Sequence, residues 1–166
     1  MNVSLEEELV STLIERNWHV ACAESCTGGL IASRIVNVAN ASKVLDVSFV
    51  TYANEAKMKY LGVSQSTILQ HGVVSEEVAA EMAAGVTKEA GAKVGIAVSG
   101  IAGPGGGTEK KPVGMVCFGF YVNGRIITKT CQFGAPGRNE VRALSTEYAL
   151  KTALELVSEN KIEVEK

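Results

Sequence analysis

The 166-residue sequence is poor in several residue classes, and each scarcity excludes a kind of protein. With two histidines, four cysteines and no CxxC pair, it lacks the inventory of a zinc site, and no metal is expected. Lysine and arginine total 16 against 18 acidic residues, and the net charge of -2 disfavours a nucleic-acid partner. No apolar run approaches the roughly 18 residues of a membrane span, and the acidic segment MNVSLEEELV is unlike a basic secretory signal. We therefore expect a cytoplasmic protein with no membrane partner.

Apolar residues make up 46% of the sequence and charged residues 20%, which is the balance of a globular protein. At this length a domain buries about two thirds of the surface of its unfolded chain and needs no disulfide or bound metal to fold. We predict a single domain over residues 1–166 with no cofactor. Buried free thiols are expected at Cys22, Cys26, Cys117 and Cys131.

The order of predicted elements is typical of an α/β domain with helices on both faces of a mixed sheet. Apolar residues at helical spacing predict helices, and runs rich in β-branched and aromatic residues predict buried strands. Asn123-Gly124, between the last two strands, is the strongest two-residue signal for a hairpin. The predicted helices cover residues 3–16 with Ser4 as N-cap, 27–36, the segment from the Asn54 cap to Gly62, 64–70, the segment from the Ser75 cap to 90, and 139–158; the predicted strands cover 18–23, 44–51, 93–99, 113–122 and 125–133.

Three polar or glycine-rich loops follow predicted strands. They are AESCTGG (23–29), TYANEAK (51–57) and SGIAGPGGGTEKKP (99–112). In open α/β sheets, ligands bind beyond the carboxyl ends of the strands. We therefore expect these loops to converge on one site at one edge of the sheet.

The first loop has two explanations. Backbone amides at the start of a helix carry a partial positive charge, so Thr27, Gly28 and Gly29 would offer an anion hole for a phosphate or a tetrahedral oxyanion. Ser25 would then be a nucleophile held at a helix N-terminus. The alternative, which the motif alone favours, is that Ser25 or Thr27 is an ordinary N-cap.

A serine nucleophile needs a base, and neither histidine is well placed. His19 begins a predicted strand, and His71 lies in a turn before a helix cap. Lys57 is the better candidate, because burial or a nearby cation lowers the pKa of a lysine, and Tyr52 would relay or orient the proton. The alternative, which spacing alone favours, is that Lys57 is a solvated helix residue.

The third loop contains more glycine than a strand-to-helix connection needs. It departs from the pattern GxxxxGK followed by Ser or Thr, so a nucleotide triphosphatase is not supported. Lys110, Lys111 and Arg138 would supply phosphate contacts near it, and a mobile surface loop with solvated lysines is the alternative. The glycines around Pro104 are Gly100, Gly103, Gly105, Gly106 and Gly107.

Together these motifs resemble the CinA C-terminal domain family. The resemblance is carried by AESCTGGLIASRI, FVTYANEAKMKYLGV, HGVVSEEVAAEMA and VSGIAGPGGGTEKKPVGMV, and it covers about residues 5–158. It implies a three-layer α/β/α sandwich that forms a homo-oligomer, a dimer or higher. For stand-alone members it implies an amidase of pyridine-nucleotide salvage, which hydrolyses the carboxamide of nicotinamide mononucleotide to give nicotinate mononucleotide and ammonia.

Carried over by position, the resemblance implies that Ser25 is the nucleophile, Lys57 its general base and Tyr52 a supporting hydroxyl. Amides near Thr27 to Gly29 would hold the oxyanion, and the chemistry requires no metal. The small-molecule nucleotide would lie against the glycine-rich loop. The implied substrate-binding residues are Thr27, Gly28, Gly29, Asn54, Gly100, Gly103, Gly106, Gly107, Arg138 and Arg142.

Two features depart from the family pattern. Asn40 to Lys43 stand where many relatives have a glycine-rich stretch, and Ser48 stands where glycine is common. The N-terminal domain of longer members, associated with ADP-ribose pyrophosphatase activity, has no counterpart in this sequence, so that activity is not expected. The alternative to an amidase is a non-catalytic nucleotide-binding module that acts through a protein partner. Thiol chemistry at Cys26 is a third, weaker hypothesis.

Overall fold

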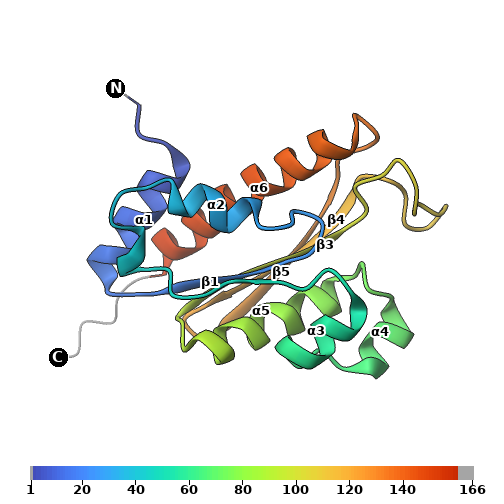
Figure 1. Ribbon diagram of the computed structural model, residues 1–166, viewed down its shortest axis with the longest axis horizontal. Helices are drawn as coiled ribbons and strands as arrows, with labels where there is room; N and C mark the ends of the chain where they lie inside the picture. Colours follow the sequence, from blue (N-terminus) through green and yellow to red (C-terminus); the bar gives the residue numbers. More distant parts are fainter. Residues whose placement is uncertain (1, 161–166) are drawn as a thin grey trace.

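The computed structural model describes residues 2–160, in which one five-stranded sheet lies between two layers of helices (Figure 1). β1 is parallel to β2 and β3, whereas β4 is antiparallel to both of its neighbours, so the predicted α/β sandwich with a mixed sheet is confirmed. The strands are β1 (Val20–Glu24), β2 (Phe49–Val50), β3 (Val94–Gly100), β4 (Met115–Val122) and β5 (Arg125–Gln132), in the order β2-β1-β3-β4-β5.

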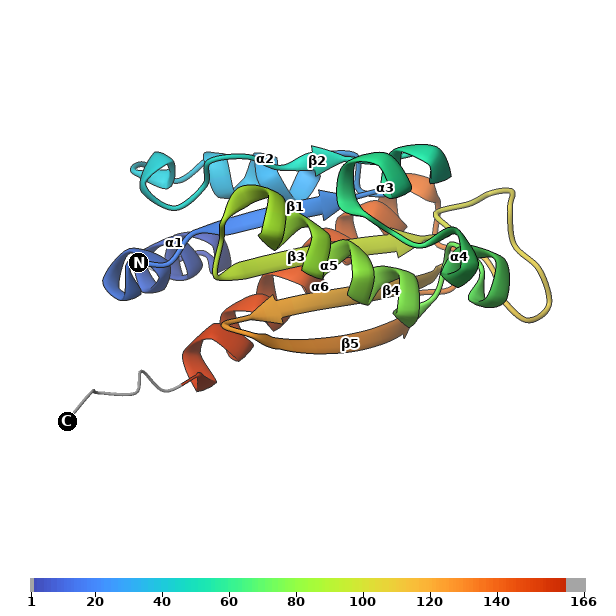
Figure 2. The same ribbon diagram turned by 90° about the horizontal axis from the view of Figure 1, so that it is seen from below.

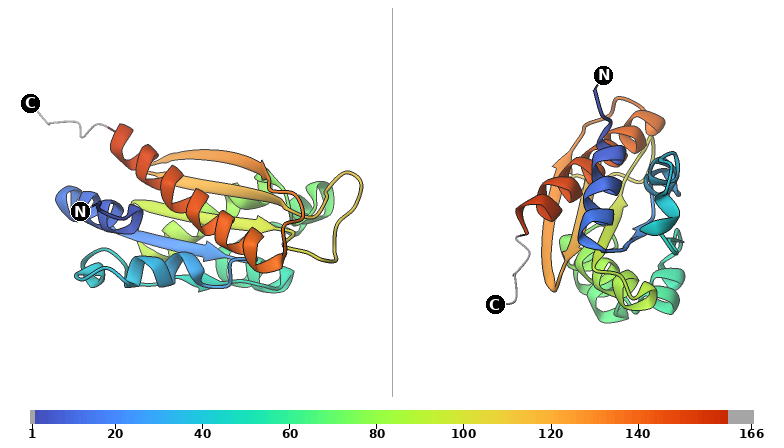
Figure 3. Two further views of the ribbon diagram at one scale, coloured as in Figure 1. Left: turned by 90° about the horizontal axis from the view of Figure 1, so that it is seen from above. Right: turned by 90° about the vertical axis from the view of Figure 1, so that its left-hand side faces the viewer.

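The helices divide between the two faces of the sheet (Figure 3). Every helix within residues 2–160 is too short or too polar to cross a lipid bilayer. One face is covered by α1 (Leu5–Arg16), α2 (Leu30–Val36) and α6 (Arg138–Glu159); on the other, α5 (Glu76–Ala90) packs on the strands, and α3 (Asn54–Leu61) and α4 (Gln65–His71) pack beside α5.

Strand β1, which lies between β2 and β3, is buried on both of its faces. Side chains alternate across a strand, so Val20 and Cys22 join the apolar cluster beneath α1, α2 and α6. Ala21 and Ala23 join the cluster beneath α5, with Met82. This packing fixes β1 from both sides and therefore fixes the position of the residue that follows it.

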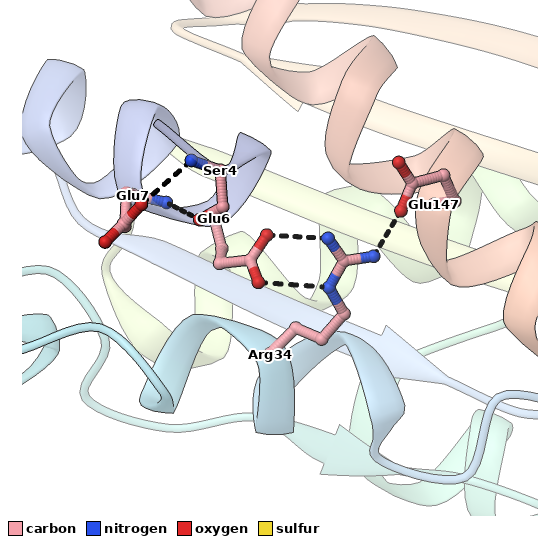
Figure 4. A network of polar contacts seen from close by, with 5 residues as sticks. All are labelled: Ser4, Glu6, Glu7, Arg34 and Glu147. Atoms are coloured by element: carbon pink, nitrogen blue, oxygen red, sulfur yellow. Dashed lines mark hydrogen bonds and ion pairs between the residues drawn. The ribbon is translucent and has the colours of Figure 1, made fainter. Parts of the chain in front are cut away.

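A network of charged side chains joins the three helices of the first layer (Figure 4). Arg34 of α2 lies between Glu6 of α1, at 2.6 Å from Nη2 to Oε2, and Glu147 of α6. The Ser4 hydroxyl accepts from the Glu7 amide while the Glu7 carboxylate accepts from the Ser4 amide, so α1 begins with a capping box. The predicted Ser4 cap is confirmed.

Most predicted elements are confirmed, with small shifts at their ends. Ser75 caps α5 by accepting from the Val78 amide, and α3 stops before its C-cap residue Gly62, whose φ is 70°. The hairpin between β4 and β5 turns at Asn123 and Gly124, whose φ values of 46° and 92° are those that an Asn-Gly turn favours.

The predicted buried strand over residues 44–51 is wrong. Only β2 is a strand there, and Val50 is 54% exposed. Before it, the Val44 carbonyl accepts from the Val20 amide, and the Ser48 hydroxyl, rather than a backbone carbonyl, accepts from the Cys22 amide at 3.1 Å. The Ser48 side chain thus makes a hydrogen bond to β1 that the backbone of a longer strand would have made.

Two helix starts differ from the sequence prediction. The helix predicted from Thr27 begins at Leu30, because Gly28 and Gly29 have φ values of 58° and 103°, outside the helical region. At α3, Ala53 occupies the N-cap position without a side-chain hydrogen bond, so Asn54 is the first helical residue and not the cap.

Candidate active site

The loops that follow β1, β2 and β3 meet at the end of the sheet where these parallel strands end (Figure 2). A cavity of about 270 Å³ lies among them. The predicted convergence of three loops on one edge is therefore confirmed. The lining residues are Ser25, Cys26, Tyr52, Asn54, Lys57, Val73, Val74, Ser99, Gly100, Ile101, Ala102, Gly103, Gly105, Gly106 and Arg138.

Ser25 occupies the first position after β1 and is held by the sheet on both sides. Its amide donates to the Val98 carbonyl of β3 at 3.2 Å, and the carbonyl of the preceding residue, Glu24, accepts from the Thr51 amide at 2.9 Å. The Ser25 side chain is nearly buried, with 8% of its surface exposed, and it lines the cavity. Its hydroxyl is thus presented from a rigid strand end.

Lys57 reaches Ser25 from the first turns of α3. Side chains on a helix lean toward its N-terminus, and that direction brings the ammonium back to the residues that precede α3. Lys57 Nζ lies 2.7 Å from the Thr51 carbonyl oxygen, 3.3 Å from that of Tyr52 and 3.1 Å from Ser25 Oγ. Only 1% of Lys57 is exposed, so the alternative of a solvated helix lysine is wrong.

Burial lowers the pKa of Lys57 from the ordinary lysine value to about 8. The residues that line the cavity, all within 2–160, include neither aspartate nor glutamate, so no lining carboxylate offsets the cost of burying this charge. When neutral, the amine can donate to both carbonyls and keep its lone pair for the Ser25 hydroxyl. The arrangement can therefore accept the proton of an attacking serine.

The turn between β1 and α2 is not capped by Ser25 or Thr27. Gly29 is the N-cap residue of α2, and the buried Glu24 carboxylate accepts from the Ile31 amide at 2.9 Å and the Ala32 amide at 3.0 Å. The N-cap alternative is therefore wrong.

Thr27, Gly28 and Gly29 do not line the cavity. The Gly28 amide, expected to face an anion, donates instead to the Ser25 carbonyl at 3.0 Å. Within the described residues, the Thr27 hydroxyl is buried without a hydrogen-bond partner. The two candidate arginines are also separated, because Arg138 lines the cavity whereas Arg142 contacts the back of the turn.

Tyr52 and Arg138 form one wall of the cavity. The Tyr52 hydroxyl accepts from Arg138 Nη2 at 2.9 Å, while the contact of Tyr52 with Lys57 is made by its backbone carbonyl. Arg138 Nη1 also donates to the Gly103 carbonyl at 2.8 Å. Gly103 has a φ of 84°, and a Cβ there would lie 2.5 Å from Val113 Cγ1, so this position requires glycine.

The glycine-rich loop is tied to the rest of the molecule. The Lys111 ammonium donates to the carbonyls of His71 and Val74, the latter at 2.6 Å, so it is not a solvated lysine. Lys110 is exposed and, like Gly107, does not line the cavity. Asn54 lines it, as do three candidate glycines of this loop, Gly100, Gly103 and Gly106.

Sequence reasoning missed part of the lining. Val73, Val74 and Ile101 give the cavity an apolar side, and the Ser99 hydroxyl donates to the Val73 carbonyl at 2.8 Å. An apolar pair before a helix cap carries no chemical signal, so sequence alone offers no reason to choose it. The remaining lining residues not named as candidate ligands are Cys26, Ala102 and Gly105.

The four cysteines are free, as predicted, although Cys131 is half-buried rather than buried. Burial raises the pKa of the Cys26 thiol to about 11, so the thiolate is scarce at neutral pH. No group of three or more His, Cys, Asp or Glu side chains within residues 2–160 is arranged to hold a metal ion.

Comparison with known proteins extends these observations. Residues 2–157 match the CinA C-terminal domain. The nicotinamide-nucleotide amidohydrolase PncC of Enterobacter agglomerans is 51% identical over 151 residues, which cover 90% of this chain and 92% of that protein. A CinA-like protein of Kosmotoga olearia is 50% identical over 147 residues, which are 89% of this chain and 35% of that protein, so this chain spans about a third of the longer relative.

Solved structures share the fold. The crystal structure of the competence damage-inducible protein A of Klebsiella pneumoniae matches with a TM-score of 0.90 and 37% identity, over 95% of this chain and 97% of that one. The corresponding protein of Agrobacterium tumefaciens matches with a TM-score of 0.86 and 38% identity, over 96% of this chain and 100% of that one.

Proposed function

This chain belongs to the CinA C-terminal domain family, and on that basis we propose that it is an amidohydrolase that converts nicotinamide mononucleotide to nicotinate mononucleotide and ammonia. The observation that carries the proposal is the 3.1 Å contact between the buried Lys57 amine and the Ser25 hydroxyl in a cavity. The relative of nearly equal length, named a nicotinamide-nucleotide amidohydrolase, supports the choice of substrate.

In the first half of the proposed reaction, Ser25 Oγ attacks the carboxamide carbon while Lys57 Nζ takes the hydroxyl proton. The carbonyl oxygen becomes an oxyanion, which free backbone amides of the turn after β1 stabilise. As the C–N bond breaks, the proton on Lys57 passes to the leaving nitrogen, and ammonia departs. Ser25 is left as an ester of the nicotinate group.

The second half restores the serine. Lys57, neutral again, takes a proton from a water molecule whose oxygen attacks the ester carbon. The ester C–O bond then breaks, and the proton on Lys57 returns to Ser25 Oγ, which releases nicotinate mononucleotide. The carbonyls of Thr51 and Tyr52 hold the amine in place through both halves, since each accepts one of its hydrogens.

The lining suggests how the substrate lies. The apolar side formed by Val73, Val74 and Ile101 suits the flat pyridine ring. Arg138 supplies a positive charge for the phosphate at the glycine-rich loop, after releasing its present partners. Tyr52 contributes its hydroxyl to that same wall, so we propose a binding role for it beside the supporting role that the family resemblance implies.

The experiment is to measure ammonia release from nicotinamide mononucleotide by the purified protein with a chelator present. The parent should release ammonia and Ser25→Ala should release none while still binding the nucleotide. Ser66→Ala, which alters an exposed serine on α4 outside the cavity, is the matched control and should retain parental turnover.

Two outcomes would decide against parts of the proposal. Turnover by Ser25→Ala would remove the nucleophile. Binding of the nucleotide without ammonia release, in parent and variant alike, would favour the non-catalytic module that acts through a protein partner.

A further inference from the structure

The turn between β1 and α2 has an unusual distribution of hydrogen bonds. Three successive peptide groups follow Ser25, and the carbonyl of each has a partner. The Ser25 carbonyl accepts from the Gly28 amide at 3.0 Å. The Cys26 carbonyl accepts from Arg142 Nε at 2.9 Å, and the Thr27 carbonyl accepts from Arg142 Nη2 at 3.3 Å and from the Leu30 amide at 3.1 Å.

These carbonyl partners also fix where the amides point. A trans peptide group is planar, with its N–H directed opposite to its C=O. Because the Ser25 carbonyl points at the Gly28 amide inside the turn, the Cys26 amide points out of the turn. Within residues 2–160, no protein group accepts from the amides of Cys26 or Thr27.

The start of α2 offers few competing donors, and the Gly29 amide, which has no acceptor within residues 2–160, belongs to a residue that does not line the cavity. The Ile31 and Ala32 amides are both taken by the Glu24 carboxylate, which is completely buried. The Gly28 amide is taken by the Ser25 carbonyl. Of the two free amides closest in sequence to the nucleophile, that of Cys26 belongs to a residue that lines the cavity, whereas Thr27 is completely buried and does not line it.

From these contacts we propose that Arg142 is a positioning residue: by holding the carbonyls of Cys26 and Thr27, it fixes the turn so that the free Cys26 amide faces the oxyanion formed on the substrate. The inference rests on the proposed amidase function. It assigns Arg142 a different role from the substrate contact that the sequence analysis expects. Arg138, which lines the cavity, remains the arginine that contacts the nucleotide.

The contacts of Arg142 support this division. Its Nε and Nη2 donate to the turn, and its Nη1 donates to the Asn139 side-chain oxygen at 3.2 Å. Each nitrogen of the guanidinium thus already has a protein acceptor. A planar guanidinium can hold two neighbouring carbonyls at once, which a lysine ammonium does less well.

The test compares steady-state kinetics of Arg142→Met, Arg142→Lys and Arg138→Met. Losing an oxyanion donor lowers kcat by about 10² to 10³-fold, so we expect Arg142→Met to lower kcat by about 10²-fold with KM within about twofold. Arg142→Lys, which keeps the charge but not the paired geometry, should lose about 10-fold. Arg138→Met should raise KM instead. Asn139→Ala removes the third partner of Arg142 and leaves both carbonyl contacts, so it should keep parental kinetics.

Substrate binding provides an independent readout. Ser25→Ala/Arg142→Met should bind nicotinamide mononucleotide as tightly as Ser25→Ala, because the oxyanion forms only during reaction. Weaker binding by the double variant, with parental kcat in Arg142→Met, would make Arg142 a substrate ligand and overturn the inference. Parental kcat and KM in both Arg142 variants would also overturn it. If the parent releases no ammonia, the proposed function itself fails, and this inference fails with it.

Discussion

Arg34 is a partly exposed cation and Lys57 a buried one, and the partners that surround them also differ. Arg34 lies between two carboxylates, those of Glu6 and Glu147, at the junction of three helices (Figure 4). Lys57 contacts two backbone carbonyls and the hydroxyl of Ser25, and no carboxylate lines the cavity around it within residues 2–160.

The pKa values follow this difference. The hydrogen bond with Arg34 lowers the pKa of Glu6, and the hydrogen bond with Glu6 raises the pKa of Arg34, so each group holds its charge more firmly. Desolvation without a counter-ion lowers the pKa of Lys57 to about 8. A charge with an ionic partner thus stabilises the fold, whereas a buried charge without one can exchange its proton near neutral pH.

The largest expected effect is from removing the unpaired cation. Lys57→Met should lower kcat by about 10³-fold, since general acid–base groups contribute about 10² to 10⁴-fold. The measurement is the rate of ammonia release at saturating nucleotide. Lys59→Met, on the same helix but exposed, is the control and should retain parental turnover. If Lys57→Met keeps more than a tenth of the activity, another group is the base.

Removing the paired cation should affect stability alone. Arg34→Met leaves the Glu6 carboxylate without its partner, so the free energy of unfolding should fall by about 1 to 2 kcal/mol in denaturant titrations. Arg125→Met, at an exposed residue of β5, should change it by less than about 0.5 kcal/mol. A fall in kcat for folded Arg34→Met would show that the Glu6–Arg34–Glu147 network affects the active site, and it would contradict the comparison.

The smallest expected effect is at the thiol beside the nucleophile. Burial raises the pKa of Cys26 to about 11. At the pH at which Lys57 begins to release its proton, Cys26 is therefore still a protonated thiol. Cys26→Ser should therefore keep turnover within about threefold, measured as ammonia release. Loss of turnover in a folded Cys26→Ser protein would restore the thiol mechanism.

Much of this arrangement could be predicted from sequence, because it depends on general rules. The carboxyl ends of parallel strands share an edge, which brings the loops of Ser25, Lys57 and Gly103 together. The Asn123-Gly124 turn was predictable for a similar reason, since few sequences favour positive φ at both positions.

What could not be predicted depends on contacts between distant residues. Nothing local in AESCTGG indicates that the Glu24 side chain turns back to occupy the amides of α2. Arg142 meets the Cys26 carbonyl across more than a hundred residues of chain, so sequence spacing cannot separate its role from that of Arg138. The shortness of β2 depends on the Ser48 hydroxyl, which takes a backbone partner from β1.

The most direct test of the account is the pH dependence of kcat/KM for nicotinamide mononucleotide. This ratio reports the pKa of groups in the free enzyme, and a base acts only when unprotonated. With the pKa of Lys57 at about 8, kcat/KM should rise about tenfold per pH unit up to roughly that value and then level off. A profile that is flat between about pH 6.5 and 9.5, or that rises without levelling toward the ordinary lysine pKa, would contradict the claim that a buried neutral Lys57 activates Ser25.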